Sequence, residues 1–255
     1  MSSLHQVATQ YRSLRFNNIA EALERLIADA ESNELTYLQF AEQLVNHEMS
    51  SRDIKRIDQN MRRAGFPLHK TLAEFDYCIQ TTVTKREINA LLDFTFIEQR
   101  QNLVFIGPPG VGKTHLATGI ALKAIEAGYK VLFVTALELI EILELAEIAG
   151  ELKKKISQLA KHDILVIDEL GYLPMSKQGM YNLFQLINAM YEHRSLILTT
   201  NKDFTSWHEF FFDDNVAVPI VDRIIHHSKI FMLGGESFRL REKLSNKANS
   251  RGMGH

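Results

Sequence analysis

Eight consecutive residues near the middle of the chain set two prolines and three glycines directly before a lysine and a threonine. They are Gly107, Pro108, Pro109, Gly110, Val111, Gly112, Lys113 and Thr114. The order follows the pattern G-x-x-x-x-G-K-[ST], in which glycines let backbone N–H groups turn toward phosphate oxygens. We expect Lys113 to reach the β- and γ-phosphates of a nucleotide, and the Thr114 hydroxyl to bind Mg²⁺. The alternative is an ordinary Gly/Pro turn. The next residue, His115, is included in the expected ATP site.

Two carboxylates end a second apolar stretch, where Asp168 and Glu169 follow the run Ile-Leu-Val-Ile at 164–167. In a fold with a phosphate loop, the strand beside the loop carries the aspartate that binds the metal. We expect Asp168 to hold Mg²⁺ through a coordinated water, and Glu169 to orient and deprotonate the water that attacks the γ-phosphate. A small-molecule kinase has no use for such a base, so the pair favours an ATPase. A solvated acidic turn is the alternative.

Two further polar residues follow apolar stretches but carry weaker signals. Asn201 comes after the run at 196–198 and could orient the attacking water, although an asparagine there is also an ordinary turn residue. Arg223 lies in an apolar helical stretch next to Asp222, and a surface arginine paired with that aspartate is the default interpretation.

The elements that must position these residues alternate between strands and helices. Apolar runs that read as buried parallel strands occur at 103–106, 131–134, 164–167, 196–198 and 230–233. Helical stretches separate them, the first at 114–127. This alternation predicts an α/β fold with a parallel sheet covered by helices on both faces. The phosphate loop would follow the first strand.

The first 65 residues have a different pattern, which predicts a small all-helical domain. Apolar residues recur at helical spacing from Leu14 to Ile27, and further helices are expected at 35–47 and 50–64. We therefore divide the chain into an N-terminal helical domain at 1–66 for assembly or DNA contact, an ATPase core at 67–244, and a flexible tail at 245–255.

Two basic stretches are candidates for contact with DNA phosphates, although a solvated helix face is an equally good interpretation of each. They comprise Arg52, Lys55, Arg56, Arg62 and Arg63 in the third helix, and Lys153, Lys154 and Lys155 in the core. A third charged pattern is acidic. Glutamates at 138, 141, 144 and 147 recur every three residues, and we interpret them as a solvated stripe.

The bulk composition limits the classes of function. The chain has 255 residues, 45% hydrophobic and 24% charged, with a formal net charge of −2, so any DNA contact must come from local patches. Its single cysteine, Cys78, allows no intrachain disulfide, which suits a reducing compartment. With no signal core and no run of 18 apolar residues, we expect a cytoplasmic protein without membrane contact.

Several short sequence motifs, in the order in which they occur along the chain, resemble those of a known family. Between about Phe66 and Arg241 the chain is similar to AAA+ ATPases of the IstB/DnaC group, and most of all to IstB-like ATP-binding proteins of insertion-sequence transposition. The phrases are KTLAEFDY (70–77), GPPGVGKTHLA (107–117), ILVIDELGYLP (164–174), LTTNKDFTSW (198–207), VDRIIHH (221–227) and GESFRL (235–240). The resemblance implies a sensor-one role for Asn201, an arginine finger at Arg223 and a sensor-two role for Arg239.

The resemblance also implies ATP-driven oligomers on DNA. A full C-terminal helical lid, which typical AAA+ proteins have, is not expected, because few residues follow GESFRL. The expected function is that of an ATP-hydrolysing, homo-oligomeric helper that binds duplex DNA and recruits or stimulates an IstA-like transposase. A replicative helicase loader of the DnaC kind is the alternative within the same class of core, and a nucleotide kinase is the alternative from another class.

Overall fold

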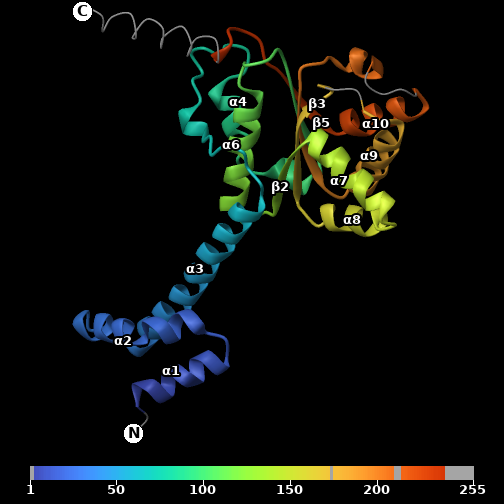
Figure 1. Ribbon diagram of the computed structural model, residues 1–255. Coiled ribbons are helices and arrows are strands. Elements are labelled where there is room, and N and C mark those ends of the chain that lie inside the picture. The colour runs from blue at the N-terminus through green and yellow to red at the C-terminus, as the bar shows by residue number, and fades with distance from the viewer. Residues whose placement is uncertain (1–2, 173–174, 210–213, 239–255) are drawn as a thin grey trace, which may run out of the picture. The chain divides into compact units, whose positions relative to one another are not determined.

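The computed structural model describes residues 3–172, 175–209 and 214–238 (Figure 1). The chain divides into two compact units, Met1–Asn60 and Met61–His255. No helix in these described ranges is both long and apolar enough to cross a membrane.

The N-terminal unit is helical, as the sequence predicts. It contains α1 (Leu4–Ser13), α2 (Asn17–Ser32) and most of α3 (Tyr37–Arg63). The chain turns between α1 and α2 at Arg15, which has a left-handed φ of 63°. The apolar core of the unit is small. It is built around Ala8, Ile19, Ala20 and Leu23.

The helix α3 differs from the sequence prediction, which divides the region into helices at 35–47 and 50–64. The structure has one continuous helix of 27 residues. Ser50 and Ser51 favour helix ends, but neither glycine nor proline lies between residues 37 and 63, so nothing forces a break. The predicted end of the region is right, since the chain leaves the helix before Gly65, at φ 74°.

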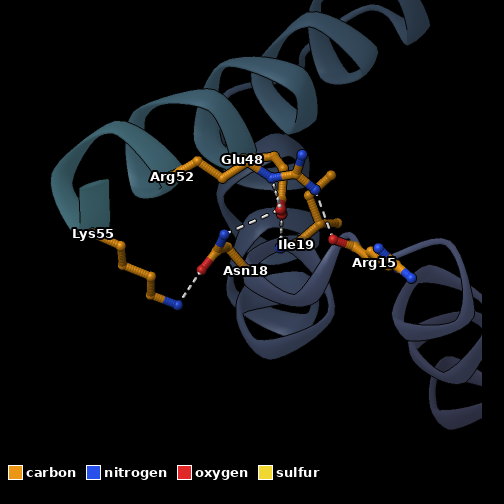
Figure 2. A network of polar contacts seen from close by, with 6 residues as sticks. All are labelled: Arg15, Asn18, Ile19, Glu48, Arg52 and Lys55. Carbon is orange, nitrogen blue, oxygen red and sulfur yellow. Dashed lines mark hydrogen bonds and ion pairs between the residues drawn. The ribbon is translucent and has the colours of Figure 1, made fainter. Parts of the chain in front are cut away.

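A polar network joins α2 to α3 around the buried carboxylate of Glu48 (Figure 2). Its oxygens accept hydrogen bonds from the backbone N–H of Ile19 at 2.9 Å, from Asn18 Nδ2 at 3.1 Å and from Arg52 Nε at 2.8 Å. Ile19 lies in the first turn of α2, where backbone N–H groups have no partner within the helix. Glu48 therefore caps α2 from another helix, 29 residues away in sequence.

The core unit contains a five-stranded parallel sheet, and all five strands predicted from the sequence are present. They are β1 (Asn102–Ile106), β2 (Val131–Thr135), β3 (Ile164–Leu170), β4 (Ser195–Thr200) and β5 (Ser228–Met232). The strand order is β2-β3-β4-β1-β5, and every pairing is parallel. The predicted α/β fold class is thereby confirmed.

Helices cover both faces of this sheet, as Figure 1 shows. The helix α6 (Lys113–Glu126) lies on one face. The opposite face is covered by α7 (Ala136–Ile148), α8 (Leu152–Leu159), α9 (Lys177–Met190) and α10 (Asp214–His226). On that side the main core forms where alternate strand residues such as Val104, Ile167 and Leu198 meet Leu139 and Leu183. The two short helices α4 (Lys85–Asn89) and α5 (Thr95–Glu98) precede β1.

The glutamates of α7 form the predicted solvated stripe only in part, since Glu138 and Glu141 are exposed whereas Glu144 and Glu147 are half-buried. Glu138 caps its own helix through Thr135. Glu144 accepts a hydrogen bond from Ser176, the N-cap of α9. Glu147 accepts one from Gln178 and one, at 2.7 Å, from the buried Asn182. The interpretation is wrong for Glu144 and Glu147, because α9 packs closely enough against α7 to bring polar residues within reach of these two carboxylates.

Candidate nucleotide-binding site

A pocket of about 810 Å³ lies at the carboxyl ends of β1, β3 and β4. Parallel strands bring the residues that follow them to one edge of the sheet, and that edge is the usual ligand site of such folds. The expected site residues that line the pocket are Pro109, Gly110, Gly112, Lys113, Thr114, His115, Glu169 and Asn201.

The phosphate loop runs from the end of β1 to the start of α6. Gly110 and Gly112 have φ values of 85° and 95°, a region that residues with a side chain rarely adopt. A Cβ on Gly112 would also lie 2.6 Å from a ring carbon of Phe75. The Lys113 ammonium lies across the loop and donates to the carbonyl oxygens of Gly107 at 2.7 Å and Pro108 at 2.8 Å.

Asp168 lies at the centre of a group of hydroxyls behind the pocket. The Thr114 hydroxyl donates to its two carboxylate oxygens, at 2.9 and 3.1 Å, and the Thr199 hydroxyl donates to Oδ1. Asp168 is only 5% exposed. The structure thus brings together Thr114 and Asp168, the two residues that the sequence predicts as holding Mg²⁺.

Glu169 points away from this buried group and is exposed at the pocket. Its φ of 61° is left-handed, which costs a residue with a side chain about 1–3 kcal/mol. The pairing of β3 with β4 shifts register between Ile167 and Leu170, so the strand bulges at this point. The strained backbone separates the two carboxylates, with one turned into the protein and the other left at the cavity.

Sequence reasoning missed the wall of the pocket that precedes β1. Leu68, His69, Lys70, Glu74, Asp76 and Ile79 all line it. His115 contacts this segment through Nε2, which lies 2.7 Å from the carbonyl oxygen of Thr71 and therefore carries the proton. Burial lowers the pKa of the His115 imidazole, although the bond to Thr71 opposes that effect. The phrase KTLAEFDY contains much of the wall, but its composition alone carries no chemical signal.

The chain returns to the phosphate loop after β5. Phe238 lines the pocket, and its backbone N–H donates to the carbonyl oxygen of Gly110 at 3.0 Å. Its ring lies 5.6 Å from that of Phe75, centre to centre, so the segments before β1 and after β5 meet beside the loop. Arg239, expected to bind ATP, lies outside the described residues, as do the residues that bear on a C-terminal lid.

Arg223 lies on α10 and is not among the described residues that line this pocket. Its guanidinium is held over the ring of Phe184 on α9, at 5.2 Å from the ring centre, and over the ring of Tyr191, the residue that follows α9, at 5.9 Å. Its Nη1 donates to the carbonyl oxygen of Pro219 at 3.1 Å. The sequence suggested Asp222 as its default partner, but the contacts found are with aromatic rings and a backbone carbonyl.

The basic candidates for DNA contact have unequal surroundings. Arg52 bonds to Glu48 and to the carbonyl oxygen of Arg15, and Lys55 bonds to Asn18 (Figure 2). Arg56 pairs with Asp53 within its own helix, at 3.1 Å, with both side chains more than half exposed. In the core, Lys154 pairs with Glu151 at 2.9 Å. Part of the basic stretch of α3 thus holds the N-terminal unit together.

The fold and the site define the class of the protein. A parallel sheet ordered β2-β3-β4-β1-β5, a phosphate loop after β1 and an Asp-Glu pair on β3 are the features of an AAA+ phosphate-loop core. Within that class the chain belongs to the family of IstB-like ATP-binding proteins, whose sequence profile matches residues 9–246.

Curated relatives agree with this assignment. The chain is 40% identical to a protein of Geobacillus stearothermophilus named as an ATP-binding protein of insertion sequence IS5376, over 88% of this chain and 90% of that protein. It is 36% identical to the corresponding IS21 protein of Pseudomonas aeruginosa, over 94% and 91%. The resemblance noted in the sequence phrases is confirmed.

Solved structures show the same fold. DnaI aligns with a TM-score of 0.53 and 20% identity, over 64% of this chain and 90% of that one. Domain III of DnaA, a replication initiation protein of Thermotoga maritima, aligns with a TM-score of 0.54 and 21% identity, over 74% and 78%.

Proposed function

We propose that the chain binds ATP with Mg²⁺, hydrolyses it, assembles on duplex DNA with ATP sites shared between neighbouring copies, and assists a separate transposase. Membership of the IstB-like family, together with relatives named after insertion sequences, supports the transposition context. One observation carries the enzymatic part. Lys113, Thr114 and Glu169 line a single pocket, and Asp168 bonds to Thr114 directly behind it.

The residues present fit a nucleoside triphosphate with Mg²⁺. The left-handed glycines Gly110 and Gly112 keep the loop free of side chains where phosphate oxygens would approach the backbone. Thr114 and Asp168 offer hydroxyl and carboxylate oxygens, the ligand types that Mg²⁺ prefers, either directly or through water. When bound, Mg²⁺ neutralises charge on the phosphate oxygens.

Three residues of the chain then have separate roles in ATP hydrolysis. Lys113 exchanges its two carbonyl partners for phosphate oxygens, and these charged hydrogen bonds are the stronger ones. Glu169, exposed at the pocket, orients a water molecule and takes its proton. Asn201, at the end of the neighbouring strand β4, holds that water or the γ-phosphate in line.

Arg223 is proposed to act on the ATP of a neighbouring copy. Its absence from the described lining of its own pocket supports a role in trans, because an arginine finger stabilises charge on a nucleotide that another subunit binds. Arg223→Ala should leave ATP affinity nearly unchanged and lower both hydrolysis and ATP-dependent assembly. Mixing it with Glu169→Gln protein should restore some activity, since some interfaces then contain one intact site. A wild type that stays monomeric with ATP and DNA, with no rescue on mixing, would rule out this role.

Phosphate release from ATP tests the enzymatic proposal. Lys113→Ala should abolish ATP binding or hydrolysis, and Glu169→Gln should bind ATP but hydrolyse it about 10²–10³-fold more slowly, a barrier increase of about 3–4 kcal/mol. Glu141→Gln, an exposed carboxylate on α7, is the matched control and should hydrolyse normally. Wild-type hydrolysis by Glu169→Gln would show that the base is another group. Transfer of phosphate to nucleosides in place of free phosphate would indicate a kinase.

The strand preference of DNA binding tests the transposition proposal. Contact with the phosphate backbone of duplex DNA should strengthen with ATP, weaken steeply with salt and depend little on sequence. Filter binding with matched single- and double-stranded oligonucleotides measures this preference. A clear preference for single strands, together with binding to a hexameric helicase, would instead identify a helicase loader.

A further inference from the structure

Thr199 is the residue of β4 that faces the bulge of β3, and neither the phosphate loop nor the Asp-Glu pair includes it. The residue borders the pocket and is 1% exposed. Ile167 pairs with Leu198 and Leu170 pairs with Thr200, so two residues of β3 lie opposite Thr199 alone. Those two residues are Asp168 and Glu169.

The Thr199 hydroxyl contacts both of them. It donates its proton to Asp168 Oδ1, and its oxygen accepts the backbone N–H of Glu169 at 3.0 Å. A hydroxyl has one proton to donate and lone pairs to accept with, so a single oxygen atom serves both functions. We propose that Thr199 is a positioning residue, which fixes the Asp168 carboxylate for Mg²⁺ and holds Glu169 in the conformation that presents its side chain to the pocket.

The bulge explains why the backbone of Glu169 needs this contact. The shift of register takes the Glu169 N–H out of the regular ladder between β3 and β4. The Thr199 hydroxyl supplies an acceptor for it. The same N–H belongs to a residue with a left-handed φ, a conformation that persists only where surrounding contacts hold it.

Asp168 accepts a hydrogen bond from a second hydroxyl, but this does not make Thr199 redundant. Thr114 also donates to this carboxylate, but Thr114 is the residue whose oxygen is proposed to bind Mg²⁺. To bind Mg²⁺ through its oxygen, Thr114 must rotate its hydroxyl away from the present hydrogen bonds with Asp168. Thr199 lies deeper, between two buried strands, and keeps its contact with Asp168 while Thr114 changes partner. The inference rests on the proposed function, because it assigns Thr199 a part in that same site.

Two pairs of variants separate the hydroxyl from packing. Thr and Val differ at position 199 by a hydroxyl in place of a methyl group, and Ser and Ala differ by the hydroxyl alone. Thr199→Val and Thr199→Ala should lower the rate of ATP hydrolysis by about 10–100-fold, the usual effect of losing a group that orients a metal ligand. Thr199→Ser keeps the hydroxyl and should stay within about threefold of wild type.

The Mg²⁺ concentration for half-maximal hydrolysis is the measurement that a purely structural role would leave unchanged. In the full-length protein it should rise in Thr199→Val and Thr199→Ala, while ADP affinity without Mg²⁺ stays within about threefold of wild type. Should Thr199→Val fail to fold, the Ser and Ala variants decide. Equal rates and equal Mg²⁺ dependence in that pair would overturn the proposal, as would a folded Thr199→Val with wild-type kinetics.

Asp168→Asn and Glu169→Gln, measured in the same assay, keep the two proposals apart. If both hydrolyse ATP normally, the proposed roles of these carboxylates fail, and the role of Thr199 fails with them. If both lose activity while Thr199→Val and Thr199→Ala retain it, the assignment of the carboxylates stands and only the inference about Thr199 is wrong.

Discussion

Two buried carboxylates, one in each unit of the chain, have opposite surroundings. Glu48 in the N-terminal unit is 4% exposed and receives hydrogen bonds from a guanidinium, an amide and a backbone N–H. Asp168 in the core is 5% exposed and receives hydrogen bonds from the hydroxyls of Thr114 and Thr199. One has a positively charged partner on its own helix. The other has neutral partners and lies behind a cavity.

The difference indicates how each carboxylate is used. The donors of Glu48 come from fixed positions on α2 and α3, and a change in any of them would disturb the packing of the unit. The donors of Asp168 are two hydroxyls, and that of Thr114 lines the pocket and can rotate toward another acceptor at little cost. A buried carboxylate that is held only by fixed donors supports the fold, whereas one that is held in part by a rotating hydroxyl at a pocket can accept a cation.

The largest expected effect follows from replacing each carboxylate by its amide. Asp168→Asn should lower Mg²⁺-dependent ATP hydrolysis by about 10²–10³-fold, because the negative charge that attracts the metal is lost. Glu48→Gln should leave the affinity for ATP with Mg²⁺ unchanged. Phosphate release and titration with a fluorescent ATP analogue measure the two quantities. A loss of ATP affinity in Glu48→Gln would show that the N-terminal carboxylate is not merely structural.

A second prediction concerns the stability of the N-terminal unit, for which Glu48 rather than Asp168 is the important carboxylate. Glu48→Ala should lower the free energy of unfolding of the N-terminal unit by about 2–3 kcal/mol, since Ile19 N–H and Asn18 lose a charged acceptor. The one tryptophan, Trp207, is buried in the core unit. Denaturation followed by circular dichroism should therefore shift, while the transition followed by Trp207 fluorescence stays in place. Glu42→Ala, an exposed residue of the same helix, is the control.

A third prediction concerns the stability of the N-terminal unit at acidic pH. Burial alone raises the pKa of Glu48, but hydrogen bonds from the Ile19 N–H, Arg52 and Asn18 outweigh it and lower the pKa below its ordinary value. The unfolded chain therefore binds the proton first as pH falls. The contribution of Glu48 to stability is complete above about pH 4.3, the ordinary pKa of glutamate, and is lost as pH falls through the lower folded value. Circular dichroism of the unfolding transition against pH should show this loss, and Glu48→Gln should remove it.

The two carboxylates also differ in how far the sequence predicts their roles. Asp168 was predictable because it follows an apolar run in a chain that also has a phosphate loop, and those signals are local. The five strands were predictable for a similar reason, since buried parallel strands are continuous apolar runs. Glu48 gave no signal, because a glutamate in a polar helical stretch looks like any exposed charge until the partner helix is known.

Features that depend on pairing between distant segments also escaped prediction. The bulge at Asp168 and Glu169 depends on how β3 pairs with β4, about thirty residues later in the chain, and the hydroxyl of Thr199 acquires its partners only through that pairing. The spacing of the glutamates on α7 predicts a solvated Glu147, because the residues near Glu147 in the sequence do not indicate that Asn182 of α9 will lie beside it. Local periodicity indicates which face of an element is buried, but not which polar residue on a neighbouring element faces it.

The smallest expected effect separates two neighbouring basic residues of α3. Lys55 bonds to Asn18, a member of the Glu48 network, whereas Arg56 pairs only with exposed Asp53 among the described residues. Lys55→Gln should lower the stability of the N-terminal unit by about 0.5–1.5 kcal/mol through the lost hydrogen bond and leave DNA binding largely unchanged. Arg56→Gln should change stability by less than about 0.5 kcal/mol.

If Arg56 contacts a DNA phosphate, its loss should reduce the slope of log affinity against log salt by about 0.9. Titrations of one duplex at several salt concentrations measure this slope, with Lys153→Gln as the parallel test of the core patch. An unchanged slope in Arg56→Gln together with a reduced slope in Lys55→Gln would mean that the network around Glu48 opens when DNA binds, and the division between structural and ligand-binding polar groups would then fail for this unit.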